Sequence, residues 1–120
     1  MVTGRWLAVA ALSMALAVGL GALSAHAFEL QGSFRKIFET AHRYHVWHSL
    51  ALIPLALIDR PDPELVWGRR LLFGGMALFS GSLYMLLWSG SGLWGRVTPF
   101  GGVVMVLGWL LVAHYGWRNR

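Results

Sequence analysis

The stretch FETAHRYHVWHSLALIPLALI, residues 38–58, runs from charged sequence into uninterrupted apolar sequence without a turn signal. Such a change within one continuous segment predicts a helix that enters a membrane from its surface. Its entrance carries three histidines at spacings of three residues, His42, His45 and His48. We therefore expect any chemistry of this chain to begin on this helix.

The composition places the chain among membrane proteins. Of its 120 residues, 57% are hydrophobic and only 12% are charged, whereas about a quarter of the residues in a soluble domain are charged. The chain has no cysteine, which excludes disulfides, thiolate metal sites and thiol catalysis. The net charge of +5 does not indicate nucleic-acid binding, because the ten basic residues lie in the gaps between apolar runs.

Four segments are each long enough to form a membrane-spanning helix. They are predicted at about residues 6–27, 40–58, 67–88 and 98–115 of a single domain, 1–120. The expected fold class is all-α, an integral membrane four-helix bundle of up-down topology, because short connections favour antiparallel neighbours. The second helix has an amphipathic start, which we expect to lie at the membrane interface.

The first segment has two interpretations. Arg5 supplies the positive start and Ala25-His26-Ala27 the small-x-small cleavage site of a secretory signal. However, the apolar run is longer than a usual signal core, and one of its faces carries small residues that let another helix approach closely in lipid. We expect the segment to stay in the mature protein. The small residues are Ser13, Ala17, Gly21 and Ala25.

Local signals predict where the later helices begin. Ser33 has a side chain suited to an N-cap. Asp62 and Thr98 have such side chains too, and each is followed by a proline suited to the first helical position. We expect helices to start at these three residues.

Small residues also recur at helical spacing in the last two segments. Gly74, Ala77 and Gly81 share one face of the third, and Gly101 and Gly108 lie two turns apart in the fourth. Faces of this kind allow helix backbones to pack closely in a membrane. We expect both faces to contact another helix.

The Lys and Arg residues are unequally divided between the two ends of the predicted spans. Six lie at the end that carries both termini and four at the other end, which favours a bacterial inner (plasma) membrane protein with both termini cytoplasmic. The six are Arg5, Arg60, Arg69, Arg70, Arg118 and Arg120, and the four are Arg35, Lys36, Arg43 and Arg96.

Four ordered motifs extend over almost the whole chain and all four predicted spans. They are Gly21-Ala22-x-x-Ala25-His26, Phe38-Glu39-Thr40-Ala41-x-Arg43-Tyr44-x-x-x-His48-x-Leu50-Ala51-Leu52, Leu78-Phe79-Ser80-Gly81-Ser82-Leu83-Tyr84, and Thr98-Pro99-x-Gly101-Gly102 with Gly108-Trp109-Leu110-Leu111. With these motifs the chain resembles the YgdD/YwdK family of small bacterial inner-membrane proteins, whose animal relatives are called transmembrane protein 256.

The resemblance implies a four-span membrane protein from a family labelled as a domain of unknown function, and it implies no reaction. It matches His26 and His48 with histidines of the family pattern. His42 and His45 stand where other residues are expected.

His26 and His48 form the strongest candidate site, because we expect them on the same membrane side, at similar depth, on neighbouring helices. Two facing imidazoles can ligate haem iron or a divalent metal, or relay protons. They can also act as neutral hydrogen-bonding groups that hold helices together, which is the interpretation we favour. Glu39 and Arg43 lie one turn apart and are expected to pair at the surface, with a gating role as the alternative.

The other histidines have a simpler interpretation. His42 and His45 are expected in the headgroup region, where a histidine is half-solvated. On one helix, residues at i, i+3 and i+6 leave the outer two about 120° apart, so the three cannot converge on one metal ion. Trp109 lies in the middle of its span, where its indole donor needs an interior partner.

The sequence contains no nucleophile with a base, no phosphate-binding loop after a strand and no carboxylate pair, so we expect neither catalysis nor a cofactor. The expected function is a structural or accessory component of the inner membrane. The alternative is a small carrier or channel for protons, ions or a small solute that uses His26 and His48, although spans one and four have almost no polar group at the midplane. The expected partners are the lipid bilayer and either further copies of the chain or a larger membrane complex.

Overall fold

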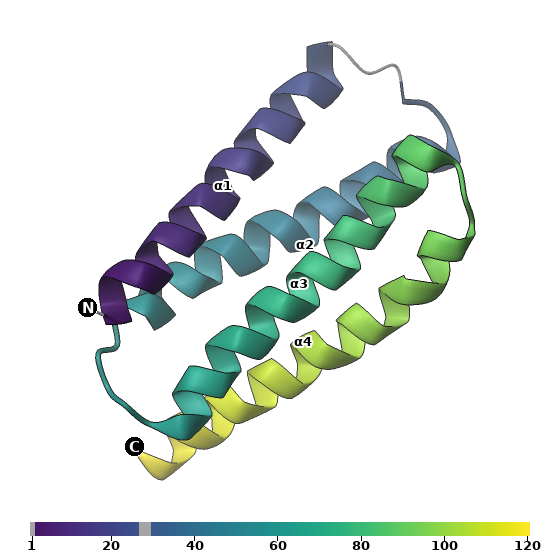
Figure 1. The fold of residues 1–120 in the computed structure, drawn as a ribbon. Coiled ribbons are helices and arrows are strands. Elements are labelled where there is room, and N and C mark those ends of the chain that lie inside the picture. Colours follow the sequence, from purple (N-terminus) through teal and green to yellow (C-terminus); the bar gives the residue numbers. More distant parts are fainter. Residues whose placement is uncertain (1, 27–29) are drawn as a thin grey trace.

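The structure is a computed structural model that describes residues 2–26 and 30–120, and the side chains from residue 4 onward. Every regular element in these ranges is a helix: α1 (Val2–His26), α2 (Ser33–Ala56), α3 (Pro63–Ser89) and α4 (Leu93–Arg118) (Figure 1). The expected all-α, four-helix architecture is therefore confirmed. The predicted end of the first span at Ala27 lies outside the described residues.

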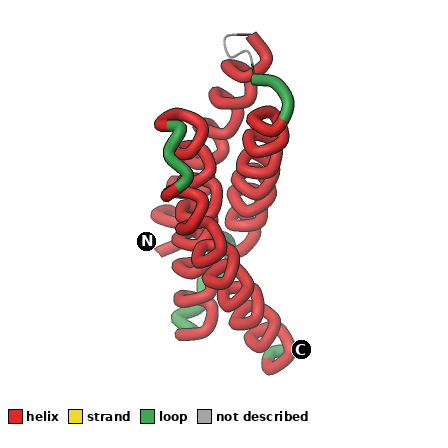
Figure 2. Tube along the Cα trace, turned by 90° about the vertical axis from the view of Figure 1, so that its right-hand side faces the viewer, coloured by secondary structure: helices red, strands yellow, loops and turns green. Residues whose placement is uncertain are grey.

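Consecutive helices run in opposite directions, as the up-down prediction requires (Figure 1). In the described part of the chain, α2 packs against α1 and α3, α3 packs against α2 and α4, and no contact joins α1 to α4. Figure 2 shows from the side that the connecting segments lie at the two ends of the helices. The helices thus form an open row with α1 and α4 at its margins, and not a closed bundle.

Three of the helices, α1, α3 and α4, are long and apolar enough to cross a membrane. α2 is long enough but not apolar enough to be counted with them, because polar residues interrupt its apolar sequence. Several of these polar side chains are buried, namely His45, His48 and Ser49. The span at 40–58 therefore stays a prediction, and α2 is the polar centre of the row whose neighbours must satisfy its hydrogen-bonding groups.

Of the three predicted N-caps, the structure confirms one. A carboxylate oxygen of Asp62 accepts a hydrogen bond from the backbone N–H of Glu64 at 2.9 Å, and Pro63 is the first residue of α3. α2 begins at Ser33 as predicted, but the prediction that Ser33 is the cap is wrong: the cap is Gly32, with φ of 60° and no side-chain bond. The prediction for Thr98 is also wrong.

The reason for the error at Thr98 is the use that the structure makes of its hydroxyl. α4 already begins at Leu93, five residues earlier, so Thr98 lies inside the helix. Its Oγ1 donates back to the carbonyl of Trp94 at 3.4 Å and lies 2.6 Å from the hydroxyl of Ser82 in α3. A hydroxyl that bonds one turn back serves packing between helices and not the start of a helix.

Glycines bring α3 and α4 closest together. A Cβ atom at Gly75 would lie 2.6 Å from the backbone nitrogen of Met105, and one at Gly108 would lie 2.9 Å from that of Leu72. The predicted packing role of Gly101 and Gly108 is therefore confirmed. The prediction for the face of Gly74, Ala77 and Gly81 is wrong, because a Cβ at either glycine would meet nothing within 4 Å.

The small residues of α1 face α2 as expected. Ser13 and Ala17 are buried, and a Cβ at Gly21 would lie 3.0 Å from Nε2 of His42. Ala25, at the end of the row of small residues, is exposed.

Candidate functional site

The three histidines of α2 contact three different helices. His42 Nε2 lies 2.8 Å from the carbonyl oxygen of Ala17 in α1. His45 lies between α1 and α3, and His48 Nε2 lies 3.0 Å from the indole nitrogen of Trp109 in α4. This divergence follows from the spacing of three residues, which turns each imidazole about 60° from the one before it. The histidines therefore join the helices of the row.

The expected half-solvated environment is wrong for His45, whereas the partial burial of His42 agrees with it. His45 is only 4% exposed, and His42 is half-buried against α1. The reason is that α1 and α3 cover the face of α2 that carries these side chains and offer hydrogen-bond partners to both. A neutral imidazole can be buried where both of its ring nitrogens have hydrogen-bond partners.

His45 belongs to a hydrogen-bonded chain whose direction can be worked out. Ser49 donates its hydroxyl hydrogen to the backbone carbonyl of His45 at 2.7 Å. Ser49 Oγ must then accept from Ser13 at 2.6 Å, since a hydroxyl has one hydrogen. For the same reason Ser13 Oγ accepts from His45 Nε2–H at 3.1 Å. His45 Nδ1 is left without a hydrogen and accepts from the Tyr84 hydroxyl at 3.0 Å.

The chain from Tyr84 to Ser49 is closed at its end. Its last hydrogen points to the carbonyl of His45 itself, and a backbone carbonyl cannot pass a proton on to a further group. A relay needs a final acceptor that can release the proton again. The four side chains form an interhelical cross-link that joins α1, α2 and α3.

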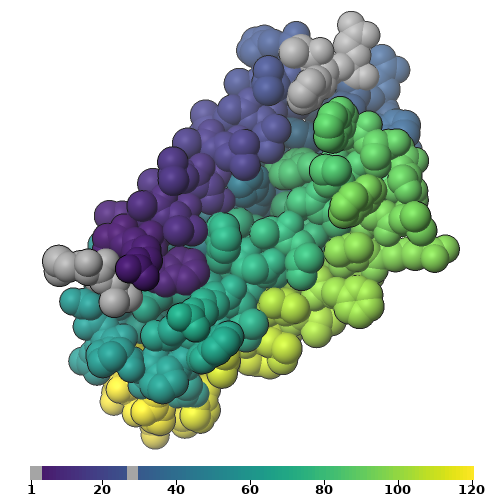
Figure 3. Space-filling model, in the orientation of Figure 1, coloured from purple at the N-terminus to yellow at the C-terminus, as the bar shows by residue number. Residues whose placement is uncertain are grey.

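A hollow lies above this cross-link, between α1 and α3. Its volume is about 450 Å³, and Figure 3 shows α2 at the bottom of the gap between α1 and α3. The wall is mostly apolar, and the polar donors at the floor are already used inside the protein, including Ser80, which donates to the carbonyl of Ala41 at 2.7 Å. The hollow thus offers a ligand no free hydrogen-bond donor from this floor.

His48 has the opposite tautomer. Its Nδ1 lies 2.9 Å from the carbonyl oxygen of Tyr44 and must donate, so Nε2 is the unprotonated nitrogen that accepts from Trp109. The prediction that the indole of Trp109 needs an interior partner is confirmed. Both ring nitrogens of His48 are occupied, which leaves none for a metal ion in this arrangement.

The structure does not bring His26 and His48 together, and the expectation of similar depth is wrong. His45 contacts Ser13 in α1, so His48, one turn further along α2, lies no closer to the end of α1. His26 ends α1, 13 residues after Ser13, a separation of about 20 Å at 1.5 Å per residue. His26 is also exposed. The two histidines therefore do not form one site.

Glu39 and Arg43 are both exposed on the surface of α2, but the expected ion pair between them is absent from this described helix. The guanidinium of Arg43 instead lies over the ring of Trp47, 5.8 Å from its centroid. A cation over an indole is the competing interaction at this spacing. Neither residue faces the cross-link.

A second polar group ties the start of α3 to the end of α4. Arg118 donates to Glu64 at 2.9 Å and to Asp62, and Glu64 also contacts His114. The hydrogen bond from Arg118 holds the pKa of the Asp62 carboxyl below its usual value. Its basic side chains are exposed and its carboxylates are half-buried. The group lies far from His45 along the bundle, so we assign it to helix attachment.

Sequence reasoning missed the partners of His45. Ser13 was interpreted only as a small residue, Tyr84 only as part of a family motif, and nothing marked Ser49. The available signal was the presence of hydroxyl side chains within uncharged apolar runs of three different helices, where each requires a partner in lipid.

Comparison with known proteins gives a consistent set of relatives. The family described as protein of unknown function (DUF423) matches residues 20–102. A UPF0382 membrane protein of Staphylococcus epidermidis is 40% identical over 105 residues, which cover 85% of this chain and 86% of the relative. The UPF0382 membrane protein YwdK of Bacillus subtilis is 36% identical over 107 residues, covering 85% and 87%. A UPF0382 membrane protein of Haemophilus influenzae is 31% identical over 121 residues, covering 97% and 96%. No solved structure matches.

Proposed function

The chain belongs to the DUF423 family, whose relatives compared above are called UPF0382 membrane proteins, and on this basis we propose an integral membrane protein with a structural or accessory role and without catalysis. Its membrane location follows from the relatives, which are called membrane proteins, and from three helices that are long and apolar enough to span a membrane. The role proposed is to provide a stable helical unit within the membrane.

The closed chain from Tyr84 to Ser49 is the observation that supports this proposal best. In a carrier or channel, interior polar groups must exchange their partners with the transported species. Here the hydrogens of Tyr84, His45, Ser13 and Ser49 all have acceptors within the protein. Polar groups that are already satisfied stabilise helix association in lipid instead.

A transport assay tests the proposal directly. Liposomes that contain the purified protein and an internal pH-sensitive dye should show the proton flux of protein-free liposomes, because the chain at His45 has no exit. Equal flux at increasing protein content is the expected result. A flux that rises with protein content and disappears in both His45→Leu and His48→Leu would establish the carrier function and contradict the accessory one.

We place the protein in the bacterial inner membrane with both termini in the cytoplasm, since more Lys and Arg residues lie at that end. Reporter fusions after Arg120 and within residues 89–92 should then report opposite sides, with Arg120 cytoplasmic. Both reporters on one side would contradict the four-span topology.

An accessory role requires a partner, and the open row leaves surface for one. α1 and α4 each expose large apolar side chains and do not cover one another within the described residues. We propose that lipid and either a second copy or a larger membrane complex cover these surfaces. Purification in mild detergent with identification of co-purifying proteins checks this: protein that runs alone as a monomer in every mild detergent would contradict it.

A further inference from the structure

Among the described residues, Arg69 has the largest fully buried side chain, with 1% of its surface exposed. It lies near the start of α3 and reaches across to the end of α2. There its Nη1 donates to the carbonyl oxygens of Leu55 at 2.8 Å and Ile58 at 3.3 Å. These two hydrogen bonds occupy Nη1 and fix the orientation of the guanidinium.

The other two nitrogens of Arg69, Nε and Nη2, are buried and have no hydrogen-bond partner in the described part of the chain. They form one edge of the planar guanidinium. Two parallel N–H donors on such an edge match two oxygens of a carboxylate or phosphate. A buried cation with an unfilled edge is costly in a membrane protein, so this edge indicates an anionic ligand.

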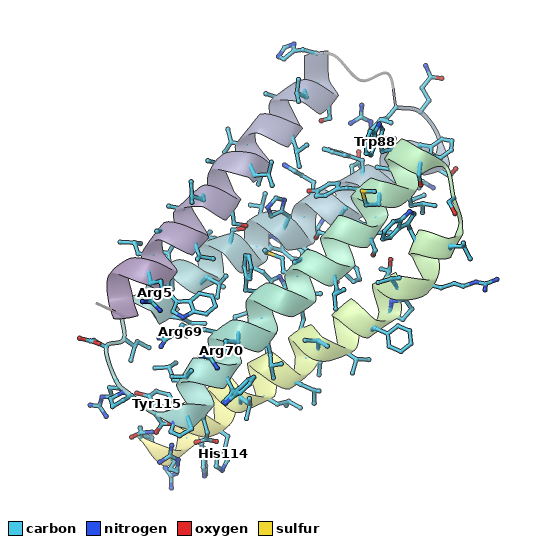
Figure 4. The ribbon with its side chains drawn as sticks, viewed as in Figure 1. Arg5, Arg69, Arg70, Trp88, His114 and Tyr115 are labelled. Atoms are coloured by element: carbon cyan, nitrogen blue, oxygen red, sulfur yellow. The ribbon has the colours of Figure 1, made fainter. Side chains whose placement is uncertain are left out.

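The charges around Arg69 also favour an anion. Three acidic residues lie at this end: Asp62 and Glu64 pair with Arg118, and Asp59 lies near enough to Arg69 to interact with it electrostatically. Figure 4 shows Arg5 and Arg70 at the same end of the bundle as Arg69, where α1 and α3 begin. This end therefore has an excess of positive charge.

Arg69 lies near the start of α3, the end at which we expect the membrane surface. It lies six residues after Pro63, about 9 Å along the axis of α3. Side chains of a helix point toward its N-terminus, so the guanidinium of Arg69 is directed back toward the start of α3. Trp67 is exposed two residues earlier, as expected for a residue at the interface.

We propose that the Nε–Nη2 edge of Arg69 binds the phosphate of an anionic phospholipid headgroup, and that Arg5 adds the second positive charge. The ligand enters where α1 begins. Trp6, next to Arg5 in α1, packs edge to face on Phe73, one turn beyond Arg69, with 6.2 Å between ring centroids. The lipid then joins α1, α2 and α3 at the end opposite to His26.

The experiment measures thermal unfolding and lipid retention in native mass spectrometry, with the full chain in neutral detergent. Phosphatidylglycerol should raise the unfolding temperature and remain bound to the wild-type protein, and phosphatidylcholine should do neither. Arg69→Lys keeps the charge but loses the two-donor edge, so phosphatidylglycerol should bind on the order of tenfold more weakly. Arg120→Lys, at the same end and exposed, is the matched control and should bind as the wild type does.

Other outcomes overturn the proposal. Equal effects of the two lipids would show that no phosphate site for anionic lipid exists, and an equal effect of inorganic phosphate at the same concentration would assign the site to a free anion. Loss of stability in Asp59→Asn, with no response to phosphatidylglycerol in any variant, would assign the edge of Arg69 to that nearby carboxylate. If Arg69→Lys does not fold, Arg5→Gln replaces it: weaker binding than in Arg120→Gln supports the site, and equal binding contradicts it.

Discussion

Replacing Gly101 by leucine is expected to lower the free energy of unfolding by about 3 kcal/mol or more, the upper range for an overpacked core. The added Cβ alone would lie 2.8 Å from the Cα of Phe79 and 2.9 Å from the carbonyl oxygen of Gly75. Both are backbone atoms, so the neighbour cannot rotate away and α3 must separate from α4. Circular dichroism during thermal unfolding in detergent, with the yield of monodisperse protein, measures the effect.

Gly81→Leu is the matched control for this change. Gly81 also lies inside a membrane helix, but a Cβ there meets nothing within 4 Å. Leucine has the higher helix propensity, so this variant should unfold at or above the wild-type temperature. If Gly101→Leu unfolded at the same temperature as Gly81→Leu, the close contact between α3 and α4 would be refuted.

His45→Leu is expected to give the second largest loss, on the order of 1–3 kcal/mol. Leucine fills much of the volume of the imidazole but leaves the Tyr84 hydroxyl without an acceptor and the Ser13 oxygen without its donor. Ser13 is buried and Tyr84 is half-buried, both among mostly apolar side chains that leave little room for water to compensate. Denaturation in detergent that is monitored by near-ultraviolet circular dichroism should show the loss, because Tyr84 lies in the affected region.

Two comparisons make this second result specific. His26→Leu changes an exposed histidine and should leave stability within a few tenths of a kcal/mol of the wild type. In the double variant His45→Leu with Tyr84→Phe, the cost should be smaller than the sum of the two single changes, because the orphaned hydroxyl is removed. Strictly additive costs would indicate that His45 and Tyr84 do not interact.

The features that were correctly predicted depend on neighbouring residues in the sequence. Long uncharged runs specify four helices, and Asp62 followed by Pro63 specifies the start of α3. Thr98 followed by Pro99 has the same local pattern but lies inside α4. What distinguishes the two is Ser82 of α3, which lies 2.6 Å from the Thr98 hydroxyl and comes from a distant part of the chain.

The choice of packing face could not be predicted for a similar reason. α3 carries small residues on more than one face, and the periodicity of one helix does not say which face a neighbour covers. The structure places Gly75 against α4 and leaves Gly74 and Gly81 without a close neighbour. To predict that Gly75 is the contact residue, one would first have had to know where α4 packs.

The histidines illustrate the same limit on sequence reasoning. Spacing along α2 correctly predicted that the outer two diverge, but the environment of His45 is set by α1 and α3 together. Arg69 was interpreted as one of several cations that flank a span. Only the fold shows that it turns inward, because the carbonyls of Leu55 and Ile58 lie within its reach.

The central claim is that the buried histidines of α2 are neutral groups that cross-link helices in fixed tautomers. Nitrogen NMR of protein labelled with ¹⁵N-histidine in lipid bilayers near neutral pH tests it most directly, with His45→Leu and His48→Leu to assign the signals. The structure predicts that His45 carries its hydrogen only on Nε2 and His48 only on Nδ1. A charged imidazolium, a metal-shifted nitrogen or the reverse tautomer at either residue would contradict the claim.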